Sequence, residues 1–411
     1  MTTPASPDPY ASARELLSGL RRRWRGILAL VALLALAAGT LSLNQRQSGS
    51  EAQPFPTTGL TFVTSTASAN DFKTDFTKSS VPFREIKLGC SGKDCIPAIV
   101  NPKYVSVAEA NSWLRDQEPV ILVRVGDDVR AFPIQILLWH EIVNTTLGGA
   151  PVAVTFCPLC NTAIAFDRTL KGQTLTFRVT GRLRYSNLIM YDDVTNSWWQ
   201  QATGEAIIGS YTGLKQATRP APIISWAAFK ATWPAGAVLS RDTGYQRDYG
   251  RNPYPGYDDI SNSPYLYRGP ELPNTLPAMR RVLGVTVGHE SVAYAFDGLA
   301  KAHVVNDTIS GTPVAIFWSP GAASPLDQDQ VAQGQDVGFA QAFERQVNGR
   351  TLTLEWDGAR FTDRETRSTW NALGQATAGP LAGDSLPPVP AIDSFWFAWV
   401  AFQPDTRVVE A

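Results

Sequence analysis

An uncharged apolar run at 26–43 is the first pattern along the chain, and it follows an arginine-rich stretch at 21–25. At about 1.5 Å of rise per residue, a helix of this length just crosses a hydrocarbon core of about 30 Å. Basic residues favour the cytoplasmic side, so we predict a cytoplasmic tail at 1–25 and a transmembrane helix or signal anchor at 26–43. The remainder is predicted to be extracytoplasmic, periplasmic or extracellular. A cleaved signal peptide stays open as the alternative, because Ala35-Leu36-Ala37 has the small residues of a cleavage site.

Residues 44–80 are predicted to be a tether, because the run turns to Gln, Ser, Pro and Thr. Short β-branched runs follow it. The runs at 120–125 and 129–132 flank turn residues, which predicts a hairpin. Pro133 then opens a short helical pattern, and a further strand at 152–156 leads into Cys157. The predicted fold class is therefore α+β and β-rich.

The pattern at 122–156 recurs without a gap at 284–318. A weaker echo links 193–199 to 363–370. Matching positions include Gly126 and Gly288, Asn144 and Asn306, and Pro151 and Pro313. Such self-similarity is typical of one module used twice. We therefore predict an internally duplicated protein with a first module at 81–270 and a second at 271–411.

The charge balance excludes one class of partner and indicates no other. The chain of 411 residues carries 36 basic and 37 acidic side chains, a net charge of -1. This balance gives no general attraction to phosphate backbones, so we predict no nucleic-acid partner and a membrane contact only through the N-terminal helix. The sequence has no Walker loop, GxSxG elbow, HExxH motif or dinucleotide fingerprint that would name a reaction, a substrate or a partner.

The candidate chemistry lies in the first module alone. Cys157-Pro158-Leu159-Cys160 follows the predicted strand, whereas the second module has Ser319-Pro320-Gly321-Ala322 at the aligned positions. His140 aligns with Ala302. The second module is therefore degenerate at these positions, although its apolar framework persists.

Three interpretations of the CxxC pair stay open. The leading one is a soft-metal site for copper or zinc with His140, Cys157 and Cys160 as ligands and Met190 as a weaker fourth. The second is a thiol–disulfide oxidoreductase in which Cys157 is the nucleophile and Cys160 the resolving thiol. The third is a short structural disulfide in an oxidising compartment.

Other residues flank these motifs. Glu141, Asp167 and Asp193 are candidates for orienting His140 or for acid–base work, or else they cap turns. Cys90 and Cys95 lie in a polar loop, where we predict a structural disulfide.

The aromatic stretch at 209–270 joins the two modules and offers a hypothesis of a different class. Long structured loops often carry function, so this segment would make the protein a non-catalytic binding module that recognises a partner or a glycan. Tyr254 is the residue whose replacement would test it.

Five stretches carry a resemblance: DCIPAIVNPKY, EPVILVRVGDDVRAFPIQILLWHEIVN, PVAVTFCPLCNTAIAFDR, GRLRYSNLIMYDDVTNSWWQ and VLSRDTGYQRDYGRNPY. With them, over roughly 95–318, the chain resembles the bacterial and archaeal domain-of-unknown-function family 3179. Cys95 departs from the glycine of that pattern, which implies that the Cys90/Cys95 pair is local to this protein. The resemblance lends no reaction, but its motifs draw attention to His140, Cys157, Cys160 and Met190.

Overall fold

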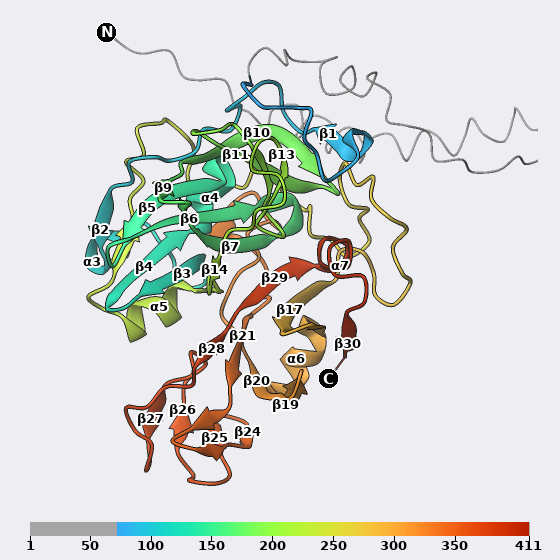
Figure 1. The fold of residues 1–411 in the computed structure, drawn as a ribbon. Helices are drawn as coiled ribbons and strands as arrows, with labels where there is room; N and C mark the ends of the chain where they lie inside the picture. The colour runs from blue at the N-terminus through green and yellow to red at the C-terminus, as the bar shows by residue number, and fades with distance from the viewer. Residues whose placement is uncertain (1–71, 411) are drawn as a thin grey trace, which may run out of the picture.

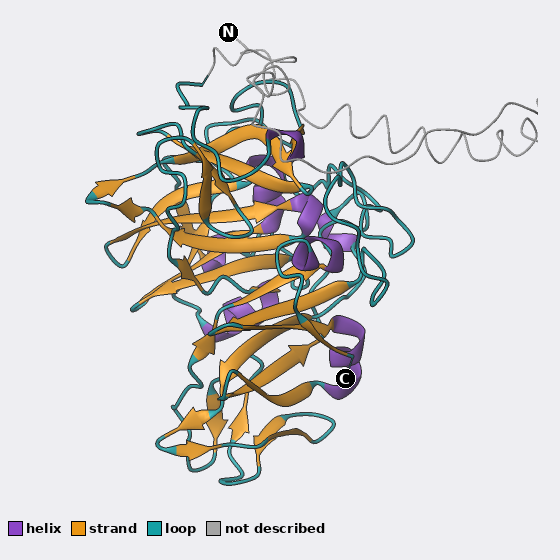
Figure 2. Cartoon of the chain, turned by 45° about the vertical axis from the view of Figure 1, so that its right-hand side comes forward, coloured by secondary structure: helices purple, strands orange, loops and turns teal. Residues whose placement is uncertain are grey.

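The computed structural model describes residues 72–410 and is β-rich with few short helices, which confirms that part of the predicted fold class (Figure 2). The helices are α3 (Val107–Ala110), α4 (Ile134–His140), α5 (Trp226–Thr232), α6 (Phe296–Ala302) and α7 (Trp396–Val400). Short 3-10 turns are η3 (Phe83–Glu85), η4 (Pro158–Cys160) and η5 (Val331–Gln333). Within 72–410 no helix has the length and apolarity needed to span a membrane. The predicted span at 26–43 lies outside the described residues, as does most of the predicted tether.

Three sheets form the first half of the chain. One sheet has the order β15 (Ile223–Ser225), β3 (Pro119–Val125), β4 (Asp128–Pro133), β16 (Ala237–Leu239) and β2 (Tyr104–Ser106). The second has the order β14 (Thr218–Arg219), β7 (Thr162–Asp167), β6 (Ala150–Cys157) and β5 (Ile142–Leu147). The third has the order β1 (Ile86–Leu88), β10 (Phe177–Arg184), β11 (Asn187–Asp192), β12 (Trp198–Gln200) and β13 (Glu205–Ile208).

Three further sheets form the second half. One sheet has the order β29 (Ala391–Phe395), β17 (Arg281–Val287), β18 (Glu290–Ala295) and β30 (Arg407–Val409). Another has the order β19 (Val304–Ile309), β20 (Thr312–Ser319), β21 (Phe339–Glu344) and β28 (Pro388–Val389). The last has the order β24 (Leu354–Trp356), β25 (Phe361–Asp363), β26 (Thr369–Trp370) and β27 (Ala376–Ala378). Two small hairpins complete the set, β8 (Thr169–Leu170) with β9 (Gln173–Thr174) and β22 (Gln346–Val347) with β23 (Arg350–Thr351).

Local sequence explains the segment that leads to the site. In β3 the first five residues, Pro-Val-Ile-Leu-Val, are buried, because β-branched side chains pack well in a sheet covered on both faces. The turn into β4 uses Gly126 at φ 60°, a conformation that glycine adopts without strain. Helix α4 is buried along its whole length, so apolar packing rather than helix propensity holds it in place.

The two halves share an order of elements. The segments β3-β4-α4-β5-β6 and β17-β18-α6-β19-β20 match in length element by element, at 7, 6, 7, 6 and 8 residues. Both helices end in a residue of positive φ, Glu141 at 57° and His303 at 60°. The Trp199 indole donates to Asp192 at 2.9 Å as the Trp370 indole donates to Asp363 at 3.0 Å. Asp192, not Asp193, is thus the counterpart of Asp363.

The two halves pack against each other through one strand of each half. In Figure 1, β29 of the second half (red) lies beside β7 of the first (green), and residues of these two strands are in contact. Phe395, Phe397 and Ala398 of the second half belong to the main apolar core of the first, which also contains Cys157 and Cys160. The CPLC turn therefore lies in a core to which both halves contribute.

Candidate functional site

The CPLC segment forms a tight turn between two strands. Strand β6 ends at Cys157, the 3-10 turn η4 follows, and Asn161 at φ 52° and ψ 40° reverses the chain into β7. Proline suits the first position of such a turn, and asparagine tolerates the left-handed conformation that ends it. Cys157 and Cys160 are both free thiols, 1% and 0% exposed. The structure thus contains no bridge between them, and both sulfurs are buried.

A strained hairpin tip faces both sulfurs. The turn between β10 and β11 uses Tyr185 and Ser186 at φ 54° and 67°, where non-glycine residues cost on the order of 1–3 kcal/mol each. It places the Ser186 carbonyl oxygen 3.8 Å from the Cys157 sulfur and 3.5 Å from the Cys160 sulfur. Strain of this kind is retained where the surroundings fix it, often at functional sites.

Asn187 brings a side-chain donor to Cys160. Its Nδ2 lies 3.5 Å from the Cys160 sulfur and also donates to Gln201 Oε1 at 2.8 Å. Its Oδ1 accepts from Gln200 Nε2 at 2.6 Å. The amide orientation is therefore fixed by buried partners on both sides, because reversing it would break these bonds.

The two thiols have unlike proton affinities. Burial raises the pKa of the Cys157 thiol, but a hydrogen bond from Cys160 and three backbone N–H groups outweigh it, so this pKa lies below its ordinary value. The three are the N–H groups of Leu188, Cys160 and Leu159. Burial, and then the bond to and charge of Cys157, raise the pKa of Cys160 well above its ordinary value. Cys157 is thus the thiol that ionises first.

Glu141 is the carboxyl group that acts on this pair. It is buried, and it occupies the positive-φ position after α4. Burial, and secondly the charge of Cys157, raise its pKa well above the ordinary value. Glu141 also lines a cavity of about 60 Å³ together with Leu159 and Leu188. The charge of Cys157 thus acts on Glu141, and the charge of Glu141 in turn helps to raise the pKa of Cys160.

His140 makes a different set of contacts. Its Nδ1 lies 2.7 Å from the Pro97 carbonyl oxygen and its Nε2 2.5 Å from the Tyr249 hydroxyl, which in turn bonds Thr243 at 2.5 Å. A carbonyl only accepts, so Nδ1 carries the proton and Nε2 accepts from Tyr249. Burial, with a smaller contribution from Arg247, lowers the pKa of His140 to about 4. The imidazole is therefore neutral and has both nitrogens occupied.

The predicted metal ligands are not gathered around one point. Among residues 72–410, no group of three or more His, Cys, Asp or Glu side chains is placed to hold a metal ion. Met190 lies in β11, 1% exposed and packed in the main core. What the structure brings together is the pair of sulfurs, with backbone and amide groups around it.

The remaining predicted residues serve local structure. The Asp167 carboxylate pairs with Arg219, and Asp193 Oδ1 accepts from the Thr176 N–H at 2.7 Å. Both bonds tie strand ends together, as expected for turn-capping carboxylates.

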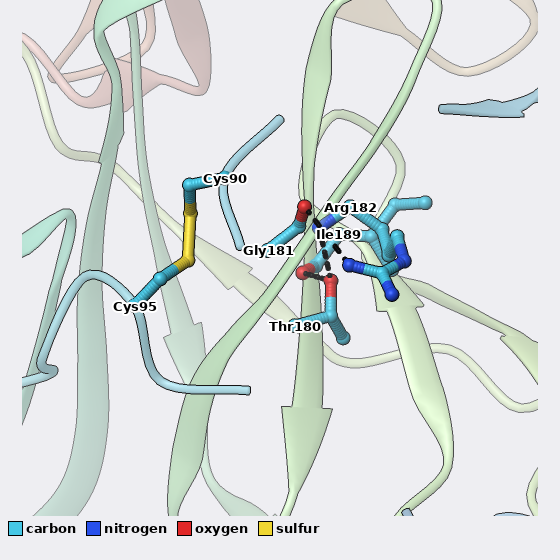
Figure 3. The surroundings of a disulfide bond; sticks show 6 residues. All are labelled: Cys90, Cys95, Thr180, Gly181, Arg182 and Ile189. Atoms are coloured by element: carbon cyan, nitrogen blue, oxygen red, sulfur yellow. Dashed lines mark hydrogen bonds between the residues drawn. A yellow bond between two sulfur atoms is a disulfide. The ribbon is translucent and has the colours of Figure 1, made fainter. Parts of the chain in front are cut away.

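The predicted disulfide between Cys90 and Cys95 is confirmed (Figure 3). It closes a loop against β10 at Gly181, which has φ +72°. A Cβ atom there would lie 3.0 Å from the Cys95 sulfur and 2.6 Å from the Gly92 carbonyl oxygen. Glycine is therefore required where the loop approaches the strand.

Two tyrosines of the aromatic stretch pack inward, whereas Tyr245 is 43% exposed. Tyr254 and Tyr257 are only 6% and 2% exposed, and the Tyr257 hydroxyl donates to the Leu159 carbonyl at 3.0 Å. Tyr257 thus bonds the backbone of the CPLC turn. Sequence reasoning missed this role and missed Ser186 and Asn187, although both fall in the quoted stretch GRLRYSNLIMYDD. The available signal was two bulky or polar residues between two strand patterns, where a glycine is usual.

Comparison with known proteins gives one match. The family model described as "Protein of unknown function (DUF3179)" matches residues 93–406. No curated protein and no solved structure gives a match. The matched region is longer than the stretch that carries the resemblance in sequence, and it includes both halves of the fold and every residue around the CPLC turn.

Proposed function

The chain belongs to the DUF3179 family, and we propose that this member is a thiol–disulfide oxidoreductase with Cys157 as nucleophile and Cys160 as resolving thiol. The observation that carries the proposal is the placement of two free thiols in one turn, both within 3.8 Å of the Ser186 carbonyl oxygen. Backbone N–H groups favour the thiolate of Cys157, and the thiolate is the reactive form. The unlike pKa values divide the two roles.

The proposed reaction is a two-electron exchange. The Cys157 thiolate attacks one sulfur of a substrate disulfide, the S–S bond breaks, and the departing sulfur takes a proton and leaves as a thiol. Cys160 then loses its proton and attacks the Cys157 sulfur of the mixed disulfide. The second substrate thiolate leaves, takes up a proton, and the Cys157–Cys160 disulfide remains. The substrate is reduced by two electrons and the pair is oxidised by two.

Glu141 is the group that we assign to accept the Cys160 proton. A carboxyl with a raised pKa is a better base toward a thiol than an ordinary glutamate, because proton transfer is efficient between groups of similar pKa. Formation of the mixed disulfide removes the negative charge from Cys157, which had disfavoured the carboxylate. Glu141 can then release its own proton to the departing substrate sulfur, and as the carboxylate it takes up the proton of Cys160.

Burial of the sulfurs selects small substrates. Cys157 is 1% exposed, and the cavity of about 60 Å³ beside Glu141 is bounded by Tyr265 and Leu266. We expect low-molecular-mass disulfides to react faster than disulfides of folded proteins, because a folded protein cannot place its sulfur against a buried thiolate.

Trapping tests the assignment of roles. In Cys160→Ser, glutathione disulfide is expected to form a stable mixed disulfide on Cys157, which adds one glutathione to the mass of the protein. In Cys157→Ser the same treatment is expected to leave Cys160 largely unmodified. Cys90→Ser with Cys95→Ser is the matched control, since it removes the other pair and leaves the CPLC turn intact. Equal modification in both single variants would contradict the division of roles.

A soft metal ion at the same two sulfurs is the second candidate, favoured by the pairing of two buried free thiols. Thiolates select soft ions, and copper(I) accepts two sulfur ligands more readily than zinc, which prefers four. His140 would join only by giving up its bond to Tyr249, and Met190 only by leaving its core position. Loading with copper or zinc and counting the bound metal tests this. One tightly bound ion that is lost in Cys157→Ser and kept in His140→Asn would favour a two-sulfur site.

We also propose an extracytoplasmic location and an ancestral duplication. The Cys90–Cys95 disulfide supports the location, because such bonds persist in oxidising compartments, and the apolar run at 26–43 would anchor the chain. The matching order of elements in the two halves supports the duplication. Labelling of intact cells with a membrane-impermeant reagent, together with the mass of the mature N-terminus, tests anchor against cleaved signal.

A further inference from the structure

The CPLC turn is held from the second half of the chain. Asn161, which ends the turn in the left-handed conformation, donates through Nδ2 to Asp393 Oδ1 at 2.8 Å. One residue further on, the Thr162 and Ser394 hydroxyls lie 3.3 Å apart. All four residues are buried, so these bonds are made away from solvent.

The positions that make this contact differ between the two halves. Asp393 pairs with Leu283 in β17, and in the first half Ile223 pairs with Ile121 at the matching place in β3. A buried carboxylate thus stands in the second half where the first has an apolar side chain. Burying a charge has a large desolvation cost unless it is paired, so an unpaired aspartate would be unfavourable here.

Arg281 pairs with that carboxylate. Its NH1 lies 3.2 and 3.3 Å from the two Asp393 oxygens, and its NH2 lies 3.9 Å from Asp258 and 3.3 Å from the Ser324 hydroxyl. Arg281 is the first residue of β17, where the matching strand β3 begins with Pro119. The pair of Arg281 and Asp393 therefore belongs to the second half, which lacks the two thiols. Asp393 bonds Asn161 at the end of the CPLC turn, which contains them.

We infer that Asp393 and Arg281 are positioning residues for the Cys157–Cys160 pair and act on it through Asn161; this rests on the proposed function. The carboxylate fixes the Asn161 amide, and the amide fixes the left-handed residue that follows Cys160 directly. A shift of that residue changes where the Cys160 sulfur lies relative to Cys157 and Ser186. The second half is then not a degenerate copy but the part that sets the geometry of the dithiol.

The test compares three variants of the full chain. Asp393→Asn keeps the size of the side chain and removes its charge, whereas Asn161→Gly removes the amide and still adopts the left-handed conformation without strain. Asp363→Asn is the matched control, because Asp363 is also a buried carboxylate of the second half, and it bonds Trp370 rather than the turn. Each variant is equilibrated in glutathione buffers to give the equilibrium constant of the Cys157–Cys160 disulfide.

We expect a shift of about tenfold, which corresponds to about 30 mV, in Asp393→Asn and in Asn161→Gly, and less than twofold in Asp363→Asn. The double variant is expected to shift no more than Asn161→Gly alone, because Asp393 acts on the pair only through the Asn161 amide. Additive shifts, or the same shift in the control, would overturn the inference. Should Asp393→Asn fail to fold, an unchanged equilibrium constant in Asn161→Gly would still overturn the inference.

A second readout separates this inference from the proposed function. Ultraviolet absorption of the thiolate follows the ionisation of Cys157 whether or not the pair ever forms a disulfide. If the wild type forms no reversible disulfide, the proposed function fails, and the inference still predicts a changed thiolate titration in Asp393→Asn and in Asn161→Gly. An unchanged titration in both variants would overturn it.

Discussion

His140 makes stability depend on pH in a direction that the structure fixes. Burial lowers its pKa to about 4 in the folded protein, from about 6.5 in an unfolded chain. Between these values the unfolded state binds more protons, so stability is fully present above about pH 6.5 and is lost as the pH falls toward 4. Integrated from pH 7.5 to pH 5, the shift amounts to about 2 kcal/mol of unfolding free energy.

The variant His140→Asn isolates this contribution from other groups that titrate in the same range. It removes the imidazole nitrogen that accepts from Tyr249, which is expected to cost roughly 1–3 kcal/mol at pH 7.5. At pH 5 the wild type has lost about 2 kcal/mol through His140, so the difference between the two proteins is expected to be smaller by that amount. Urea unfolding at both pH values measures it. A difference that is the same at pH 7.5 and pH 5 would refute the assignment of His140 as a neutral, doubly bonded support.

Three further predictions concern the loop closed by Cys90 and Cys95 and the proposed base Glu141. Gly181→Ala is expected to destabilise the protein by more than about 1 kcal/mol beyond Gly126→Ala, because both have positive φ but only Gly181 has atoms where the Cβ would lie; equal losses in thermal unfolding would contradict this. Cys90→Ser with Cys95→Ser is expected to lower the unfolding free energy by roughly 2 kcal/mol and to leave the glutathione equilibrium of the CPLC pair unchanged; a shifted equilibrium would implicate the loop in the site. Glu141→Gln is expected to slow closure of the mixed disulfide roughly 100-fold in stopped-flow measurements, and an unaltered rate would remove Glu141 from the reaction.

The fold follows from short-range patterns that a sequence displays. Runs of β-branched residues on both sides of Gly126 predict the hairpin of β3 and β4. The Cys90–Cys95 bond joins two residues that are close in the chain. The likeness between 122–156 and 284–318 also shows in the sequence, because matching residues follow in the same order without a gap. The strands β3 and β17 that lead into these segments have equal lengths. Local spacing is sufficient for features of this kind.

The surroundings of the CPLC turn do not follow from such patterns. Asn161 and Asp393 are 232 residues apart, and nothing near either of them indicates the other. The Ser186 carbonyl reaches the sulfurs only because Tyr185 and Ser186 adopt positive φ, which the sequence does not favour. His140 bonds Pro97 and Tyr249, two partners that lie 43 and 109 residues away in the chain. Residue type alone therefore does not show which contacts such a side chain makes.

A redox titration tests the central claim most directly. Wild-type protein is equilibrated in buffers of reduced and oxidised glutathione, and free thiols are alkylated and counted by mass. The account predicts that Cys157 and Cys160 change together, by two electrons, with a midpoint above about -300 mV, while Cys90 and Cys95 stay bonded. A CPLC pair that remains reduced in every buffer, or one with a midpoint far below that value, would contradict the claim that these two sulfurs exchange electrons with a substrate.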